Sequence, residues 1–173
     1  MFKVFLKAWL FCMGVCLGIY GHAEDGPPVA SREYQLKTAY LFHFAELAEW
    51  PESAPVTICL QGNSPIRAYL PVLNGQQIDN KAVSVKLGTL IAIEECQILF
   101  FSELNALSQS VLAQAQKYHV LLVSDAEEFA QKGGMIQFTL RDNKLKLVVN
   151  LASVKLAGLK LSSKLLRMAE ILE

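Results

Sequence analysis

The chain has 173 residues, of which 16 are basic and 16 acidic, so its formal net charge at pH 7 is zero. A chain of this length supports one domain with a hydrophobic core of its own. The balanced charge excludes the strongly basic footprint that is typical of a nucleic-acid-binding protein.

The first 23 residues have the three parts of a secretory signal peptide. Lys3 and Lys7 form a basic start, and an apolar stretch follows from Ala8 to Tyr20. Gly21-His22-Ala23 is a small-residue cleavage site. Cleavage after Ala23 removes two lysines and leaves a periplasmic chain of 150 residues with a net charge of −2. An uncleaved membrane anchor is the alternative.

Four cysteines occur in the chain, and the predicted signal peptide contains two of them, Cys12 and Cys16. The mature chain keeps Cys59 and Cys96, which we expect to form a disulfide in an oxidising periplasm. Such a bond should stabilise the fold by roughly 4 kcal/mol on the chain-entropy model. The alternative is two reduced cysteines packed as small apolar side chains.

Residues 24–32 contain Gly26, Pro27 and Pro28 and predict a flexible tail, followed by a single domain at 33–173. Apolar residues then recur at helical spacing and predict a helix from Ser31 to Glu49, which ends before Pro51. Its predicted inward stripe consists of Leu36, Tyr40, Phe44 and Leu47. Because other aromatic residues make the helix apolar over much of its circumference, we expect it to be buried on two sides, in the domain or against a partner.

Short apolar runs alternate with helical segments in the rest of the chain. Strands are predicted at 56–60, 83–87, 98–101 and 120–123. Helices are predicted at 65–73, 105–118 and 126–131. A hairpin follows, with strands at 135–140 and 145–149 and a four-residue loop. A helical segment from Leu151, a break at Gly158 and a last helix capped by Ser162 or Ser163 end the chain.

This order predicts an α/β fold. We expect a three-layer sandwich, in which a mainly parallel sheet with one antiparallel C-terminal hairpin has helices on both faces.

The mature sequence contains no recognisable set of catalytic residues. His43 falls within an apolar helix, where a packing role is the simpler interpretation, and His119 directly precedes a strand. The two histidines do not have metal-ligand spacing, and both cysteines are expected to be bonded. We therefore predict no catalytic residues, no metal and no cofactor, and expect the protein not to be an enzyme.

Two loop segments are candidates for binding a small ligand. Gly62, Asn63 and Ser64 precede a predicted helix, and Ser124 and Asp125 lie at the carboxyl end of a predicted central strand, where α/β sheets bind ligands. Helix capping by the serines explains both segments without a ligand.

The C-terminal segment has more large apolar side chains than one helix face requires. Core packing is the default interpretation, and a protein-binding patch with a basic rim is the alternative. The candidate contact residues are Leu159, Leu161, Leu165 and Leu166, with Lys164 and Arg167 at the rim.

Several segments together have the order and spacing of a known family. They are Lys37–Phe44, Glu49–Pro51, Cys59–Gly62, Cys96–Phe100, Val123–Asp125, Phe129–Ala130, Gly133–Ile136 and Gly158–Leu166. With these segments the chain resembles the YfiR-like family of bacterial periplasmic proteins over about residues 33–172.

The resemblance implies a repressor. A family member would bind the periplasmic sensor domain of an inner-membrane diguanylate cyclase, hold the enzyme inactive and so limit cyclic di-GMP and biofilm formation. The resemblance also implies a homodimer and possible sequestration by an outer-membrane lipoprotein with a peptidoglycan-binding domain. Cys59 and Cys96 match the family's long-range disulfide, whereas the second cysteine pair of some members is lacking. A periplasmic sensor of small molecules is the alternative function.

Overall fold

The structure is a computed structural model that describes residues 29–52 and 54–172. The predicted signal peptide and residues 24–28 of the predicted tail lie outside these residues. Helix α1 begins at Val29, so the last four residues of the predicted 24–32 tail are helical. Within the described ranges, no helix combines the length and the apolar character needed to cross a bilayer.

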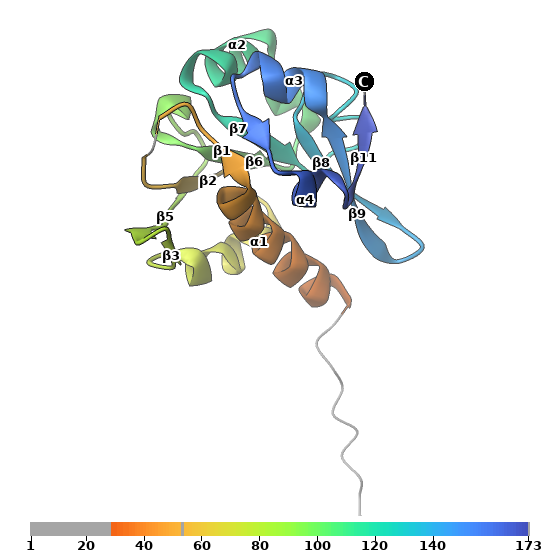
Figure 1. The fold of residues 1–173 in the computed structure, drawn as a ribbon. Coiled ribbons are helices and arrows are strands. Elements are labelled where there is room, and N and C mark those ends of the chain that lie inside the picture. The colour runs from red at the N-terminus through yellow and green to blue at the C-terminus, as the bar shows by residue number, and fades with distance from the viewer. Residues whose placement is uncertain (1–28, 53, 173) are drawn as a thin grey trace, which may run out of the picture.

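A seven-stranded mixed sheet in the order β11-β9-β8-β7-β6-β2-β5 forms the centre of the fold (Figure 1). Its strands are β2 (Thr57–Gln61), β5 (Ser84–Gly88), β6 (Ile98–Phe101), β7 (Leu121–Ser124), β8 (Ile136–Arg141), β9 (Lys144–Asn150) and β11 (Ala169–Leu172). Strands β5, β2, β6, β7 and β8 are parallel, β9 pairs with β8 in an antiparallel hairpin, and β11 runs parallel to β9. The predicted mainly parallel sheet with a C-terminal hairpin is confirmed.

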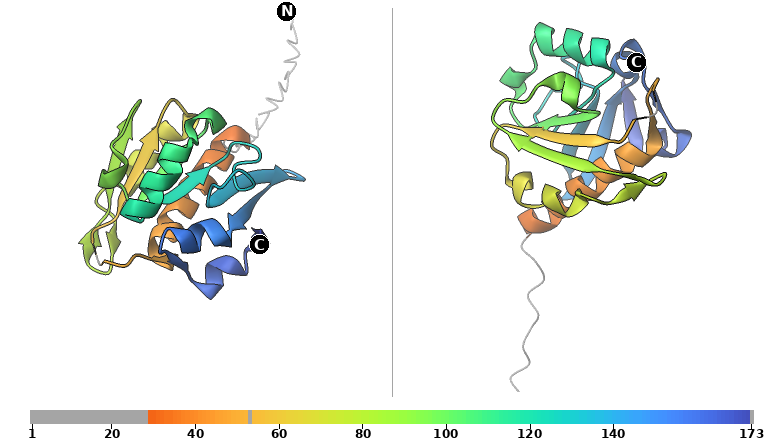
Figure 2. Two further views of the ribbon diagram at one scale, coloured as in Figure 1. Left: turned by 90° about the horizontal axis from the view of Figure 1, so that it is seen from above. Right: turned by 90° about the vertical axis from the view of Figure 1, so that its left-hand side faces the viewer.

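Helices lie on both faces of this sheet. The right-hand view of Figure 2 shows the sheet between α2 at the top and α1 below. The helices are α1 (Val29–Leu47), α2 (Gln109–Tyr118), α3 (Leu151–Leu156) and α4 (Ser163–Leu166). The 3₁₀ helices are η1 (Pro65–Ala68), η2 (Leu70–Leu73), η3 (Ile93–Glu95) and η4 (Leu104–Ala106). Two small antiparallel pairs join β1 (Ala48–Glu49) to β10 (Lys160–Leu161) and β3 (Gln77–Ile78) to β4 (Lys81–Ala82).

The buried face of α1 coincides only in part with the predicted stripe, of which Phe44 is buried and Tyr40 and Leu47 are half-buried against the core. The buried residues of α1 are Lys37, Thr38, Leu41, Phe44 and Ala45. The Phe44 ring stacks on Phe138 of β8 with 5.7 Å between the ring centroids. Leu36, which we predicted to point inward, is 44% exposed. The helix is rotated relative to the prediction because two polar residues, Lys37 and Thr38, occupy the buried face.

The central strands are the continuous apolar runs in the sequence. All residues of β6 and β7 are buried, as expected for parallel strands that are covered on both faces. Cys59 of β2 is bonded to Cys96, which precedes β6, and both cysteines are buried. The bond therefore joins β2 to the segment that leads into its neighbouring strand, β6.

The hairpin between β8 and β9 is tighter than predicted. Arg141 pairs with Lys144, so the loop has two residues, Asp142 and Asn143, instead of four. Both have positive φ angles, 52° and 56°, as in the type I′ turns that suit two-residue hairpins.

Two predicted helices take other forms. Residues 65–73 form η1 and η2 instead of one helix, since Pro71 at the start of η2 lacks the N–H that a continuous helix needs. Ser64 precedes η1, but its side chain makes no capping hydrogen bond. Residues 126–131 form turns, and Glu128 has a φ angle of 59°, which is incompatible with a right-handed helix.

The chain ends in a strand and not in the predicted last helix. Helix α4 is a single turn, capped by Ser162, whose Oγ accepts a hydrogen bond from Leu165 N at 3.3 Å. The chain then extends as β11 along the outer edge of β9. This pairing satisfies backbone groups of β9 that would otherwise form the edge of the sheet.

Candidate partner-binding surface

The predicted C-terminal contact residues divide into two groups. Leu159 and Leu165 are 2% and 0% exposed and belong to the hydrophobic core, so neither is available to a partner. The residues that reach the surface are Leu161 and Leu166, which are half-buried, and Lys164 and Arg167, which are exposed. Any contact with a partner through this segment has to use the second group.

Contacts with the end of α1 hold this segment in place. Leu161 of β10 pairs with Ala48 of β1, which directly follows α1. Ser162 N donates a hydrogen bond to Leu47 O at 2.8 Å. The partly exposed leucines are therefore attached to the body of the domain.

Positive charge dominates the C-terminal part of the sequence. Residues 143–169 contain six lysine or arginine residues and no aspartate or glutamate. Four of these cations are exposed around α3, β10 and α4: Lys155, Lys160, Lys164 and Arg167. We call these four residues, together with Leu161 and Leu166, the basic C-terminal surface. Its composition favours a partner that carries acidic side chains around an apolar contact.

Apolar grooves lie on two sides of α1. A groove of 290 Å³ separates α1 from α4; its lining residues are Leu36, Ala39, Tyr40, His43, Leu47, Lys164 and Met168. A groove of 420 Å³ lies towards η1 and η2; its lining residues are Gln35, Thr38, Ala39, Ala68, Tyr69, Val72 and Leu73. Leu36, Val72 and Met168 are 44%, 66% and 45% exposed. The exposure of Val72 and Met168 was not predictable, because nothing in their local sequence distinguishes an exposed apolar residue from a core residue.

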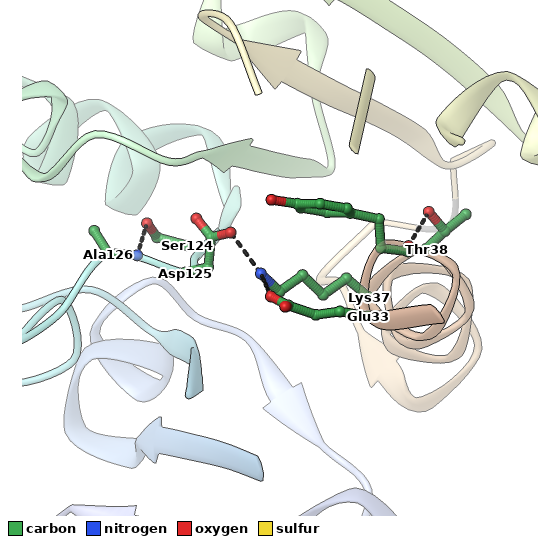
Figure 3. A network of polar contacts seen from close by, with 7 residues as sticks. Glu33, Lys37, Thr38, Ser124, Asp125 and Ala126 are labelled. Atoms are coloured by element: carbon green, nitrogen blue, oxygen red, sulfur yellow. Dashed lines mark hydrogen bonds and ion pairs between the residues drawn. The ribbon is translucent and has the colours of Figure 1, made fainter. Parts of the chain in front are cut away.

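A buried lysine joins α1 to the carboxyl edge of the sheet (Figure 3). Lys37, only 4% exposed, donates from Nζ to Asp125 Oδ2 at 2.6 Å and pairs with Glu33 Oε1 at 2.5 Å. Its Nζ also lies 5.1 Å from the centroid of the Tyr34 ring. Thr38 is satisfied within the helix, because its Oγ1 donates to Tyr34 O at 2.8 Å.

The charge of Lys37 is stabilised by these partners. Burial alone lowers the pKa of the ammonium, but the hydrogen bonds and charges of Asp125 and Glu33 outweigh burial and raise the pKa above its ordinary value of 10.5. A lysine that stays protonated is a structural cation and not a general base at neutral pH. Asp125, a predicted ligand residue, is thus engaged by α1.

The predicted ligand segments lie at the carboxyl ends of β2 and β7, with β6 between these strands. Ser124 Oγ accepts a hydrogen bond from Ala126 N at 3.0 Å, a local turn contact. Ser64 is buried, and its Oγ has no hydrogen-bond partner among the residues that the structure describes. A cleft of 220 Å³ includes Asp125 but none of residues 62–64; it is lined by Glu33, Lys37, Asp125, Glu127, Gln137, Phe138, Thr139, Leu140 and Leu145.

The two histidines have local partners. His43 Nδ1 lies 2.7 Å from Glu46 Oε2 on the exposed side of α1. His119 ends α2 in the left-handed conformation, and its Nδ1 lies 2.8 Å from Ala157 O. Among residues 29–52 and 54–172, no group of three or more His, Cys, Asp or Glu residues is placed to hold a metal ion.

Comparison with known proteins identifies the family. The family model described as YfiR/HmsC-like matches residues 34–170, which covers nearly all of the folded domain. No curated protein matches the chain significantly. The chain belongs to the YfiR/HmsC-like family.

Proposed function

We propose that the mature protein is a periplasmic negative regulator. It binds the periplasmic domain of an inner-membrane diguanylate cyclase and represses the synthesis of cyclic di-GMP. The family match over residues 34–170 carries this proposal. The signal-peptide pattern of residues 1–23 and the Cys59–Cys96 disulfide support a periplasmic location.

The basic C-terminal surface is the contact that we propose for the cyclase. Its two partly exposed leucines, Leu161 and Leu166, supply apolar area, and Lys164 and Arg167 supply positive charge beside them. This arrangement has the apolar centre and polar rim of protein interfaces. Charge complementarity with an acidic partner would speed association and make it sensitive to salt.

Repression by binding needs no active site. A regulator that binds only the inactive arrangement of the cyclase shifts the population towards that arrangement. Reducing the active form to one part in a hundred requires differential binding of roughly 3 kcal/mol. An interface with a few well-packed apolar residues can supply a free energy of this size.

Deletion of the gene tests the proposal. Cyclic di-GMP should rise in the deletion strain and return to its original level when the wild-type gene is restored. The variant Leu166→Asp should fold, as judged by circular dichroism, and fail to restore repression. Leu90→Asp is the matched control, because Leu90 is 85% exposed on the loop after β5 and should repress normally. Unchanged cyclic di-GMP in the deletion strain would overturn the proposal.

A small-molecule sensor is the second candidate function. The observation that favours it is the 220 Å³ cleft beside Lys37 and Asp125 at the carboxyl edge of the sheet, where α/β proteins bind ligands. Thermal-shift screening with amino acids and nucleotides tests it. A ligand at a hundred times its dissociation constant should stabilise the fold by about 2.7 kcal/mol.

A further inference from the structure

The two edges of the seven-stranded sheet differ in how they are covered. At the β5 edge, Val83 N donates a hydrogen bond to Gln76 O at 2.7 Å, and Val85 N donates to Asn74 Oδ1 at 3.1 Å. At the other edge, the main chain of β11 bonds to β9 and to no other part of the chain that the structure describes. Strand β11 therefore ends the sheet as an open edge (Figure 1).

The pairing of β9 shows which of its main-chain groups face β11. Asn150 N donates to Met135 O at 2.9 Å, in the register that continues the β8–β9 hairpin. Along an antiparallel pair, residues that exchange hydrogen bonds with the neighbouring strand alternate with residues that do not. Val149 and Leu147 lie one and three positions before Asn150, so their N–H and C=O groups face β11 and not β8.

The free groups of β11 follow from this pairing. In a parallel ladder, a residue whose groups face the neighbouring strand bonds to the residues on either side of its partner. The partners of these two β9 residues are Ala169 and Ile171, so Glu170 and Leu172 bond to β9. The N–H and C=O groups of Ala169 and Ile171 consequently point outward, away from the sheet.

Positive charge surrounds the open edge. Strand β9 pairs with β11, and α3 and α4 also contact it. The exposed cations on these three elements are Lys144, Lys146, Lys155 and Lys164. Arg167 lies two positions before the strand, and the acidic side chain of β11, Glu170, is paired with Arg141 at 2.7 Å. The edge therefore has a surplus of positive charge.

This charge decides between two kinds of strand that could pair with β11. A β11 strand from a second copy would bring two basic surfaces together, and like charges repel. An extended segment with acidic side chains would be attracted to the same cations. The edge is also continuous with the basic C-terminal surface, because only Met168 separates Arg167 from Ala169.

We propose that an extended acidic segment in the periplasmic domain of the cyclase adds a strand to the sheet along β11. The outward N–H and C=O groups of Ala169 and Ile171 bond to its main chain, which is the usual source of affinity in strand addition. Its acidic side chains lie beside the cations of β9 and α4. The inference rests on the proposed function for the identity of the partner, but not for the site.

A proline at position 171 tests the pairing. Ile171→Pro removes an outward N–H and keeps the bonds of β11 to β9, and proline is tolerated at such positions of an edge strand. Ile171→Ala is the matched control, because it also loses the isoleucine side chain but keeps the N–H. Both variants should fold, as judged by circular dichroism. In the deletion strain, Ile171→Ala should repress cyclic di-GMP synthesis and Ile171→Pro should not, since an unpaired acceptor on the cyclase weakens binding about tenfold or more.

The outcomes separate the site from the function. If the wild-type gene does not lower cyclic di-GMP in the deletion strain, the proposed function fails. If the wild-type gene lowers it and Ile171→Pro does so equally well, the regulatory function stands and strand addition is wrong.

Amide hydrogen exchange tests the edge without the cyclase. In the free protein, measured by NMR, the Ile171 amide should exchange faster than the amides of Glu170 and Leu172. The probe is a capped synthetic peptide of alternating glutamate and valine residues, which should slow exchange at Ile171 about tenfold at saturation. A peptide with lysine in place of glutamate is the control and should have no effect.

Three results of this measurement would each overturn the proposal. They are no slowing at Ile171, equal slowing by the two peptides, and slowing that grows with protein concentration alone. The last result would mean that a second copy occupies the edge.

Discussion

Lys37 of α1 donates a hydrogen bond from Nζ to Asp125 Oδ2 at 2.6 Å, although 88 positions separate the two residues in the sequence. The contact attaches the first half of α1 to the carboxyl end of β7. The second half of the helix is held by apolar packing, in which Phe44 contacts Phe138. Because one rigid helix carries both contacts, the Lys37–Asp125 pair also determines which side of α1 faces outward.

Replacement of Lys37 should therefore destabilise the fold. Lys37→Met leaves the carboxylates of Glu33 and Asp125 close together without a cation, at 20% and 17% side-chain exposure. We expect the free energy of unfolding to fall by about 2–3 kcal/mol, below the range for fully buried pairs, because water still reaches both carboxylates. Urea unfolding followed by circular dichroism measures this change.

Lys155→Met is the matched control for this substitution. Lys155 is exposed on α3, and its replacement should change the free energy of unfolding by about 0.5 kcal/mol or less. Equal effects of the two substitutions would show that the Lys37 contacts contribute nothing to stability.

The Lys37 contribution should depend on pH in a defined direction. The folded protein holds the pKa of Lys37 above 10.5, so its stabilising contribution is complete below pH 10.5 and is lost as the pH rises through the folded-state pKa. The difference in unfolding free energy between the wild type and Lys37→Met should thus be constant from neutral pH to the unfolded-state pKa of 10.5. It should shrink at higher pH. A difference that grows above that pH would contradict the ion-pair interpretation.

Loss of the disulfide should cost more than loss of any single surface contact. Cys59 and Cys96 are 37 positions apart, and the chain-entropy model gives about 4 kcal/mol for a loop of this length. The double variant Cys59→Ala/Cys96→Ala should lose this amount in urea unfolding. The wild type unfolded with a reductant should behave like the variant, whereas unchanged stability in both would show that the bond does not constrain the unfolded chain.

The central strands of the sheet were predictable because their signal is local. Each of β6 and β7 is a short continuous apolar run, and the predicted bounds agree with the structure to within one residue. The rotation of α1 was not predictable in this way. Lysine is normally an exposed residue, and Lys37 is buried only because Asp125, far away in the sequence, lies opposite it.

The C-terminal region shows the same limit. Residues 169–172 have no strong strand pattern, and they form β11 because β9 offers an open edge. The sequence identified the apolar C-terminal residues as candidates for a partner contact but could not separate core from surface. Leu165 and Leu166 are neighbours, and only the short α4 turn decides that one is buried and the other half-buried.

The different burial of these two adjacent leucines predicts different losses of stability. Leu165→Ala should lower the free energy of unfolding by about 2–5 kcal/mol, because Leu165 is fully buried in the core. Leu166→Ala should cost less than about 1.5 kcal/mol, since part of the side chain is already in contact with water. Thermal and urea unfolding of the two variants measure the difference. Equal losses of stability would assign Leu166 to the core as well and remove it from the proposed basic C-terminal surface. If Leu166→Ala is instead stable but binds the cyclase domain more weakly, the Leu166 side chain contributes to the interface.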